Sequence, residues 1–328
     1  SLVDAFFMED GTEPILGYNA DGSPQINPNA PLYSEKGFST EPEYRETDYY
    51  LMDGYNDNNY PDVTPERDGK RLIVQPNTFN MYCHREPRFY LTVVWNGQWF
   101  KWENRNTNFL YGGPDGGPTH DAPQNGYLNR SRVSLDYIPR DNNHPYRPAI
   151  IFRMAEAYLS YAEALNECSE RMSYEQEILN NLNKIRHRAG IAEYGTGTDE
   201  NGFTRIKINF ADQKEVRRLI HKERRVEFVG EGIRYHDLRR WKTAHYGIGN
   251  MNEQGENPDW GVNGPDHGMN YYGTEYTDQG DNAFFKRTKY MDRVYPRKFY
   301  WYPIHQSEID KDPTLVQGLS LIHISEPT

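Results

Sequence analysis

The chain has few of the features that mark common enzymes and membrane proteins. Only two of its 328 residues are cysteines, Cys83 and Cys168, so the sequence provides neither a disulfide framework nor a cysteine-based zinc site. We expect both thiols to be small buried or half-buried side chains. No apolar run approaches the ~20 residues that a membrane-spanning helix requires. The motifs G-x-S-x-G and H-E-x-x-H and a lysine-containing phosphate loop are also missing, which leaves those reaction classes without support.

Positive charge and hydrophobic residues are also scarce. The chain has 37 Lys and Arg against 48 Asp and Glu, a net charge of -11, and 36% hydrophobic residues. Without a basic field to displace counterions, a nucleic-acid partner is not expected. The mean hydropathy of -0.95 indicates that much of the chain is loop. Aromatic residues are plentiful at 14%, with 26 tyrosines, each of which combines apolar area with a hydroxyl group.

Residues 1–147 read as a loop-rich segment, because Gly, Pro, Asn and Asp are frequent and helical periodicity is rare. Its clearest predicted strands run from Arg88 to Trp95 and from Gln98 to Trp102, joined by Asn96-Gly97 in a tight β-hairpin turn. We expect the aromatic side chains of this hairpin to belong to the core rather than to a ligand site. These are Trp95, Trp99 and Phe100.

Residues 148–190 are predicted to form a helical hairpin. Pro148 would lie in the first turn of its first helix, and apolar residues recur at helical spacing through Leu165. Ser173 is expected to cap the second helix, and Gly190 to end it in a left-handed conformation. This pair and a second one at residues 211–244 predict a tetratricopeptide-like arrangement, with residues 192–209 as an inserted loop.

The second predicted hairpin, residues 211–244, carries an unusual density of charge. An apolar stripe marks its first helix, and Gly230 and Gly232 provide the break before the second. Carboxylates and guanidiniums lie at spacings that allow ion pairs within and between the two helices. We interpret these charges as a structural network made of Glu223, Arg224, Glu227, Arg234, Asp237 and Arg240.

The stretch ERRVEFVGEGIRYHDLRRW, from Glu223 to Trp241, resembles the C-terminal signature of the SusD/RagB family of outer-membrane glycan-binding lipoproteins. Four further places are similar to family segments and follow the family order. They are residues 1–11, 85–97, the helix pair 153–191, and 299–309. No single motif is as specific as a metal-binding cysteine set, but their order along the chain strengthens the resemblance.

The resemblance implies a SusD-like fold that is mainly α with long loops. The expected parts are tetratricopeptide-like helical hairpins and a loop-rich region containing a short β-hairpin. Residues 1–317 would be the C-terminal part of one SusD-like domain, with a loop-rich C-terminal segment at 245–317. Residues 318–328, GLSLIHISEPT, depart from the family pattern and read as a non-native tail.

The resemblance also implies a function. We expect a non-enzymatic cell-surface protein of the outer membrane that binds oligosaccharide or another nutrient. It would pass this ligand to a SusC-like TonB-dependent transporter. Membrane attachment would come only through a lipid anchor on a preceding N-terminal part. No cofactor or metal is expected, because the acidic loop with Asp53, Asp57 and Asn59 lacks the glycine and closing glutamate of an EF-hand calcium site.

Sugar rings present flat C–H faces, so a binding site needs exposed aromatic rings together with short polar side chains for the hydroxyls. Two loops supply both. The candidate ligand-binding residues are Tyr49, Tyr50, Tyr55, Asn56, Tyr60, Trp260, Tyr271 and Tyr272. The alternative for each aromatic is that it packs its loop onto the helices. Two other functions stay open on the sequence alone, a glycoside hydrolase and a helical-repeat adaptor for a protein partner.

Overall fold

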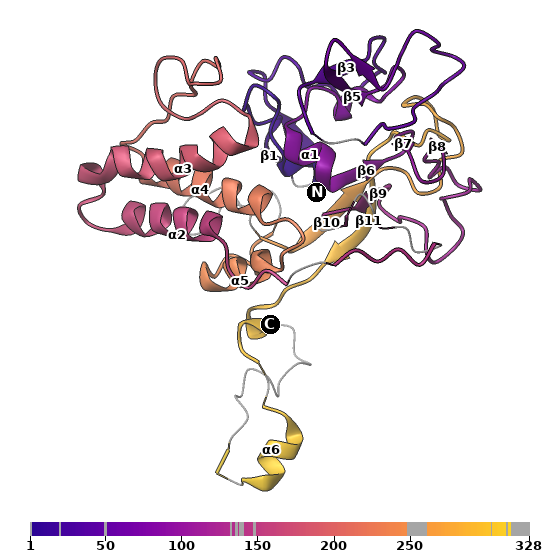
Figure 1. Ribbon diagram of the computed structural model, residues 1–328. Helices are drawn as coiled ribbons and strands as arrows, with labels where there is room; N and C mark the ends of the chain where they lie inside the picture. Colours follow the sequence, from indigo (N-terminus) through magenta and orange to yellow (C-terminus); the bar gives the residue numbers. More distant parts are fainter. Residues whose placement is uncertain are drawn as a thin grey trace.

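The computed structural model describes residues 2–19, 21–48, 51–131, 133–134, 137, 141–146, 149–247, 261–302, 304–312 and 314–315. Three predicted ligand residues, Tyr49, Tyr50 and Trp260, therefore lie outside the described residues, as do Pro148 and the tail 318–328. The rest divides into two halves, with long helices gathered on one side and short strands and loops on the other (Figure 1).

The helical half contains the predicted helices. Their bounds are Met154–Glu167 for α2, Glu175–Ala189 for α3, Gln213–Glu227 for α4 and Ile233–Arg240 for α5, with a 3-10 turn η4 at Arg171–Tyr174. Helix α2 packs against both α3 and α4 (Figure 1). Helices thus form where the periodicity predicts them, while their arrangement as tetratricopeptide-like hairpins stays a prediction.

The helix ends differ from the sequence expectation at two places. Helix α2 begins at Met154, later than predicted, and Ile151 before it is 97% exposed, so it cannot belong to the buried stripe. Ser173 lies in the turn η4 and does not cap α3, whose N-cap is Tyr174 without a side-chain hydrogen bond. Gly190 ends α3 at φ 70°, which confirms the predicted left-handed stop.

Helix α4 follows its apolar stripe closely. Val216, Leu219, Ile220 and Val226 are all buried. Its N-cap, Asp212, accepts hydrogen bonds from the backbone N–H groups of residues 214 and 215, which satisfies two of the otherwise unpaired donors of the first turn. After α4, both glycines of the predicted break adopt positive φ, 77° at position 230 and 80° at position 232.

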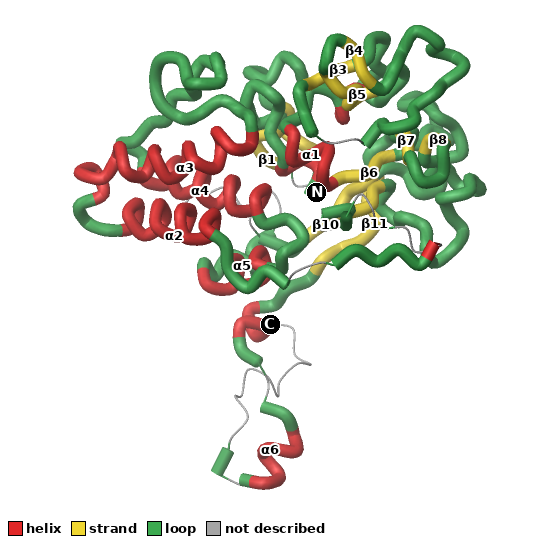
Figure 2. The backbone as a smooth tube through the Cα atoms, viewed as in Figure 1, coloured by secondary structure: helices red, strands yellow, loops and turns green. Residues whose placement is uncertain are grey.

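The loop-rich half is built around small two- and three-stranded sheets (Figure 2). The antiparallel pairs are β1 (Ile15–Tyr18) with β2 (Pro24–Ile26), β5 (Lys70–Val74) with both β3 (Glu43–Arg45) and β4 (Glu66–Arg67), β6 (Val93–Trp95) with β9 (Tyr127–Asn129), β7 (Trp99–Phe100) with β8 (Arg105–Asn106), and β10 (Gly264–Gly268) with β11 (Thr288–Arg293). Its short helical segments are η1 (Val3–Ala5), η2 (Asn80–Tyr82) and α1 (Pro87–Thr92). Of the two later segments, η5 (Arg297–Tyr300) packs near α5 and α6 (Gln306–Lys311) lies apart from both halves (Figure 1).

The predicted hairpin between Arg88 and Trp102 is wrong. Pro87 starts the helix α1, which occupies most of the expected first strand, and β6 pairs with β9 instead. The turn at Asn96-Gly97 does form, with Gly97 at φ 88°. Thr107 then lies between the two arms: its hydroxyl donates to the carbonyl of Trp95 and accepts from the N–H of Gln98. This side chain separates the arms, so β7 pairs with β8.

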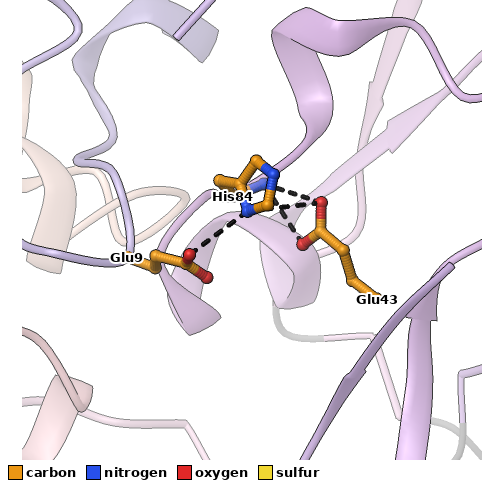
Figure 3. Close-up of side chains that lie close together, drawn as sticks. All are labelled: Glu9, Glu43 and His84. Carbon is orange, nitrogen blue, oxygen red and sulfur yellow. Dashed lines mark hydrogen bonds and ion pairs between the residues drawn. The ribbon is translucent and has the colours of Figure 1, made fainter. Parts of the chain in front are cut away.

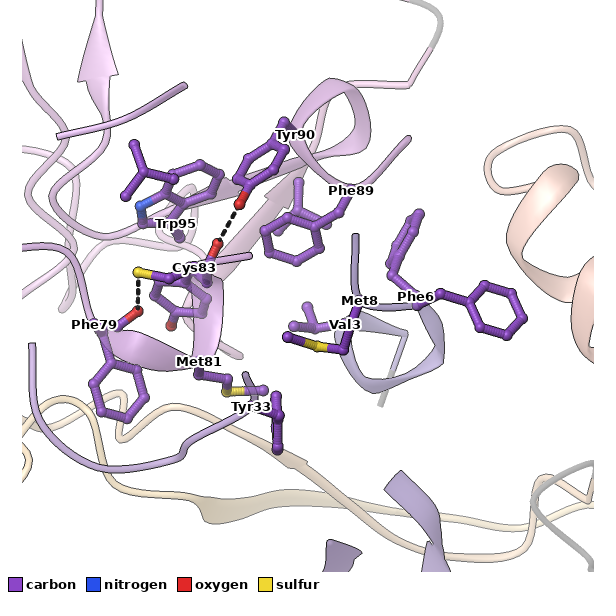
Figure 4. Close-up of a cluster of buried hydrophobic side chains, with 14 of the residues drawn as sticks. Val3, Phe6, Met8, Tyr33, Phe79, Met81, Cys83, Phe89, Tyr90 and Trp95 are labelled. Atoms are coloured by element: carbon purple, nitrogen blue, oxygen red, sulfur yellow. Dashed lines mark hydrogen bonds between the residues drawn. The ribbon is translucent and has the colours of Figure 1, made fainter. Parts of the chain in front are cut away.

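The core of the loop-rich half is aromatic (Figure 4). Trp95 is 1% exposed and stacks on Phe89 with ring centroids 5.7 Å apart. Trp99 is also buried, so both tryptophans lie in the interior as expected, whereas Phe100 is only half-buried. Cys83 is buried in this core and Cys168 is half-buried, both as free thiols. Among the described residues, no helix has the length and apolarity to cross a membrane.

Candidate functional site

Three tyrosines from two loops form an exposed cluster, which we call the tyrosine cluster: Tyr111, Tyr271 and Tyr272. The ring centroid of Tyr111 lies 6.0 Å from that of Tyr271 and 5.7 Å from that of Tyr272, and the latter two are 5.1 Å apart. Tyr272 is 72% exposed and Tyr111 is 36% exposed. Large aromatic rings left in water at this density are a feature of binding surfaces rather than of a folded core.

The loop that carries Tyr111 is held by a charged pair. Arg105 donates two hydrogen bonds to Asp115, at 2.6 and 2.7 Å, and the backbone N–H of Asn108 donates to the same carboxylate at 2.8 Å. Burial acts to raise the pKa of Asp115, but these hydrogen bonds outweigh it and lower the pKa below its ordinary value. The carboxylate is therefore charged and engaged in holding the loop.

Glycines allow the loop to fold tightly beneath the rings. A Cβ on Gly116 would lie 1.9 Å from the carbonyl oxygen of Leu110, and a Cβ on Gly117 would lie 2.4 Å from the hydroxyl of Tyr271. Neither position has room for a side chain. The N–H of Gly112 also donates to the carbonyl of Gly117 at 2.7 Å, which closes the loop on itself.

The second loop is joined to the first by backbone. The N–H of Tyr111 donates to the carbonyl of Gly273 at 2.8 Å, and the N–H of Gly273 donates to the carbonyl of Asn270 at 2.9 Å. The side-chain oxygen of Asn270 accepts from the N–H of Tyr272 at 3.2 Å. These bonds fix the backbone positions that carry the three rings, and ordering of the loops before a ligand arrives lowers the entropy cost of binding.

The tyrosine cluster has the chemistry of a sugar platform. Its rings offer flat faces for the C–H surface of a pyranose. Within the described part of the chain, the three phenolic hydroxyls have no hydrogen-bond partner, so each can donate to or accept from a ligand hydroxyl.

The other predicted ligand residues do not join this cluster. Tyr55 is 4% exposed and its ring meets that of Trp99 edge-on at 5.5 Å, so it is a core residue and the expectation for it is corrected. Asn56 is exposed and Tyr60 half-buried. Asp57, considered for calcium, accepts hydrogen bonds from the backbone and side chain of Asn59. The prediction for Tyr55 is wrong because the sequence does not distinguish buried from exposed tyrosines.

Sequence reasoning missed Tyr111, which completes the cluster. Its signal was available in the run Leu110-Tyr111-Gly112-Gly113-Pro114, where one aromatic residue enters a segment dense in glycine and proline. A large side chain in such a segment has few neighbours along the chain to bury it. The structure shows that its neighbours come instead from a loop about 160 residues later.

The predicted charge network is largely buried and reaches beyond the helical hairpin. Glu223 and Arg186 are both fully buried and lie 2.5 Å apart. Arg88, on α1, contacts Glu223 at 3.4 Å and Glu227 at 3.1 Å, so it ties α4 to the loop-rich half. Burial acts to raise the pKa of Glu227, but Arg88 and its neighbouring cations lower it overall. Sequence spacing could not indicate Arg88 or Arg186, which lie far away in the chain.

A second part of the network joins α4 to α5. Arg224 donates two hydrogen bonds of 2.9 Å to Asp237, a bidentate geometry, and Arg240 donates a third to the same carboxylate at 2.9 Å. Arg234 lies over the ring of Trp241, with its guanidinium carbon 5.9 Å from the centroid. Each of the six predicted residues therefore makes contacts inside the protein, and Arg240 also lines a cavity beside α5.

A cavity of about 1110 Å³ lies beside α5. Its lining includes Trp241, stacked on the buried His221 at 3.4 Å, and the carboxylates Glu163 and Glu167. Glu163 pairs with Arg240, and Glu167 pairs with Arg217. Both carboxylates are therefore paired with arginine, while Arg239, Lys242 and Arg297 add further positive charge to the lining.

Comparison with known proteins identifies the relatives of this chain. The sequence model of the SusD family matches residues 1–319, and the chain belongs to that family. SusD-like protein P25 of Formosa agariphila is 35% identical over 109 residues, which are 33% of this chain and 18% of that protein.

Solved structures agree on the fold. A SusD-like protein of Bacteroides fragilis NCTC 9343 superimposes with a TM-score of 0.55 and 24% identity, covering 97% of this chain and 45% of its own. The selenomethionine form of BT4246 gives a TM-score of 0.55 with 20% identity, covering 97% of this chain and 44% of its own. The chain thus has a SusD-like fold and spans less than half the length of these structures.

Proposed function

We propose that this chain binds oligosaccharide on the tyrosine cluster and takes part in nutrient capture at the cell surface. The observation that carries the proposal is the exposed, prearranged set of rings of Tyr111, Tyr271 and Tyr272, whose hydroxyls are available to a ligand. Membership of the SusD family supports a glycan as the nutrient.

The proposal assigns binding without catalysis. The carboxylate nearest to the tyrosine cluster in its own loop, Asp115, is held by two hydrogen bonds from Arg105 and has a lowered pKa. A general acid for glycoside cleavage needs a raised pKa, and it needs a second carboxylate across the scissile bond. The lowered pKa of Asp115 favours its ionised form, so we assign this carboxylate to holding the loop in shape.

The proposal extends to delivery of the bound glycan to a SusC-like TonB-dependent transporter in the outer membrane, with a lipid anchor elsewhere in the protein as the membrane attachment. The helical half would serve as the scaffold, because buried ion pairs hold its helices together. Copurification with the cognate transporter from outer membranes tests this part. Absence of the transporter under conditions that retain glycan binding would contradict it.

The binding step is tested by calorimetry with a panel of neutral oligosaccharides, followed by product analysis of any mixture that gives heat. We expect saturable binding without cleavage. Tyr272→Ala should weaken it by about 1–2 kcal/mol, roughly five- to thirtyfold, because an aromatic side chain that supplies ligand contact area is lost. Tyr146, which is 89% exposed and outside the tyrosine cluster, provides the matched control as Tyr146→Ala. Cleavage products would indicate a glycoside hydrolase instead. Equal losses of oligosaccharide affinity in both variants would contradict binding at the tyrosine cluster.

A further inference from the structure

A half-buried cluster of two carboxylates and one imidazole lies in the loop-rich half (Figure 3). Glu9, Glu43 and His84 each point one potential ligand atom inward, and the three atoms lie within 4.8 Å of one another. The Nδ1 atom of His84 is 3.2 Å from Oε1 of Glu9 and 3.7 Å from Oε1 of Glu43. Two ligands of a tetrahedral ion held at ~2.1 Å are separated by roughly 3.4 Å, so these spacings suit one metal ion.

Backbone pairing builds this arrangement from segments that are distant in sequence. The N–H of Glu9 donates to the carbonyl of His84 at 2.8 Å, next to the bridge between Met8 and Arg85. The N–H of His84 donates to the carboxylate of Glu43, which begins strand β3, at 3.0 and 3.2 Å. His84 has φ 54°, a left-handed conformation that turns its ring between the two carboxylates. The ligand atoms are therefore placed by the main chain.

The neighbouring cation leaves the inner oxygens available. Arg45 contacts Oε2 of Glu9 and lies 3.5 Å from Oε2 of Glu43, while its Nη1 donates to the carbonyl of Arg85 at 2.7 Å. The Oε1 atoms lie near the Nδ1 atom of His84; Oε1 of Glu43 also accepts from the His84 N–H at 3.0 Å and keeps a second lone pair for an ion. With His84 neutral, the two carboxylates of Glu9 and Glu43 and the one guanidinium of Arg45 leave one negative charge. A cation between the Oε1 atoms would offset that charge.

We propose that Glu9, Glu43 and His84 form a binding site for a divalent transition-metal ion, with zinc as the best-matched species. Nitrogen and carboxylate ligands suit zinc, whereas magnesium and calcium prefer oxygen ligands alone. Three protein ligands leave a fourth position open to water. The side chain of His84 is 41% exposed and that of Glu9 is 35% exposed, so an ion can reach the site directly from solvent.

The ion would crosslink three segments of the fold. It joins the N-terminal segment, strand β3 and the segment before α1, which are otherwise connected here by hydrogen bonds and by Arg45. Because zinc binds the folded arrangement and the three ligands are separated in the unfolded chain, zinc stabilises the fold in proportion to the logarithm of its concentration above Kd.

The test is zinc titration of the tag-free, EDTA-treated chain by isothermal calorimetry, with thermal melts in parallel. We expect one zinc per chain and a melting temperature that rises by a few degrees at saturating zinc. His84→Asn and Glu9→Gln should each weaken zinc binding at least tenfold. Asparagine is chosen because it tolerates the left-handed backbone at position 84, and Glu9→Gln provides an independent variant if the first fails to fold.

The matched control is His187→Asn. His187 also lies beside a carboxylate, 3.3 Å from Glu193, and its side chain is 44% exposed, but it has no second carboxylate in an equivalent place among the described residues. This variant should bind zinc within twofold of the wild type. Absence of zinc binding up to millimolar concentration would overturn the proposal, and so would zinc affinity that survives unchanged in folded His84→Asn. Magnesium in place of zinc should give no saturable heat.

Discussion

The two halves of this protein are stabilised in different ways. In the helical half, periodic apolar stripes bury α2, α3 and α4 against one another, and carboxylate–guanidinium pairs such as Glu223 with Arg186 lie at the buried junctions. In the loop-rich half, aromatic rings and glycine turns take the place of long elements. A regular helical half and an irregular loop-rich half are thus joined within one chain by buried charges such as Arg88, which contacts α4.

The largest effect should come from breaking that junction. Glu223→Ala removes one partner of a fully buried pair and leaves the charged guanidinium of Arg186 without its carboxylate partner. This costs about 3–5 kcal/mol of unfolding free energy. Circular dichroism melts measure this loss. The control is Glu308→Ala, whose pair with Lys311 at 2.7 Å is exposed and is worth less than about 1 kcal/mol. A wild-type melting transition in Glu223→Ala would contradict the structural role of the network.

A smaller effect is expected in the loop beneath the tyrosines. Gly116→Ala places a Cβ against the carbonyl of Leu110, so the loop must shift at a cost of about 1–3 kcal/mol. Because that loop carries Tyr111, oligosaccharide affinity should fall together with stability. Calorimetry and melting on the same sample measure both. Thr119→Ala, an exposed change in the same loop, is the control. Unchanged affinity in Gly116→Ala would separate the loop from the binding site.

The helical half should also respond to pH through His221. Burial lowers the pKa of this imidazole well below its ordinary value of 6.5, and neighbouring arginines lower it further. The folded state therefore binds fewer protons than the unfolded state below pH 6.5, so stability should fall as pH decreases from about 6.5 toward the folded pKa. His221→Phe keeps a flat ring on Trp241 and should weaken that dependence.

Denaturant melts at pH 7 and pH 5.5 test this prediction. His187→Asn, which changes an exposed histidine in the same half, should keep the wild-type dependence. Identical pH dependence in His221→Phe and the wild type would show that other groups are responsible.

The smallest effect concerns the start of α4. Asp212→Ala removes the acceptor for two backbone N–H groups and should cost about 1 kcal/mol, a shift of a few degrees in melting temperature. Asp212→Asn keeps an acceptor oxygen and should retain most of the stability. A larger loss in the asparagine variant than in the alanine variant would contradict the capping role.

The sequence was most informative where one local rule decides the structure. The apolar stripe from Val216 to Val226 predicts α4, and Gly190 predicts the end of α3. Both predictions depend on local properties of the chain, the helical period and the left-handed backbone conformation. The hairpin failed because Pro87 and Thr107 decided the pairing. For the candidate site, the sequence indicates Tyr271 and Tyr272 as candidates, whereas their neighbour Tyr111 and the burial of Tyr55 depend on contacts between distant segments.

The most direct test of the account is hydrogen–deuterium exchange with and without a saturating oligosaccharide found in the calorimetric screen. We expect the ligand to slow exchange mainly in residues 108–117 and 270–273, which carry the tyrosine cluster. Helices α2 to α5 should keep their exchange rates. Protection around Trp241 and the cavity beside α5, with no change in the two tyrosine loops, would contradict the assignment of ligand binding to the loop-rich half.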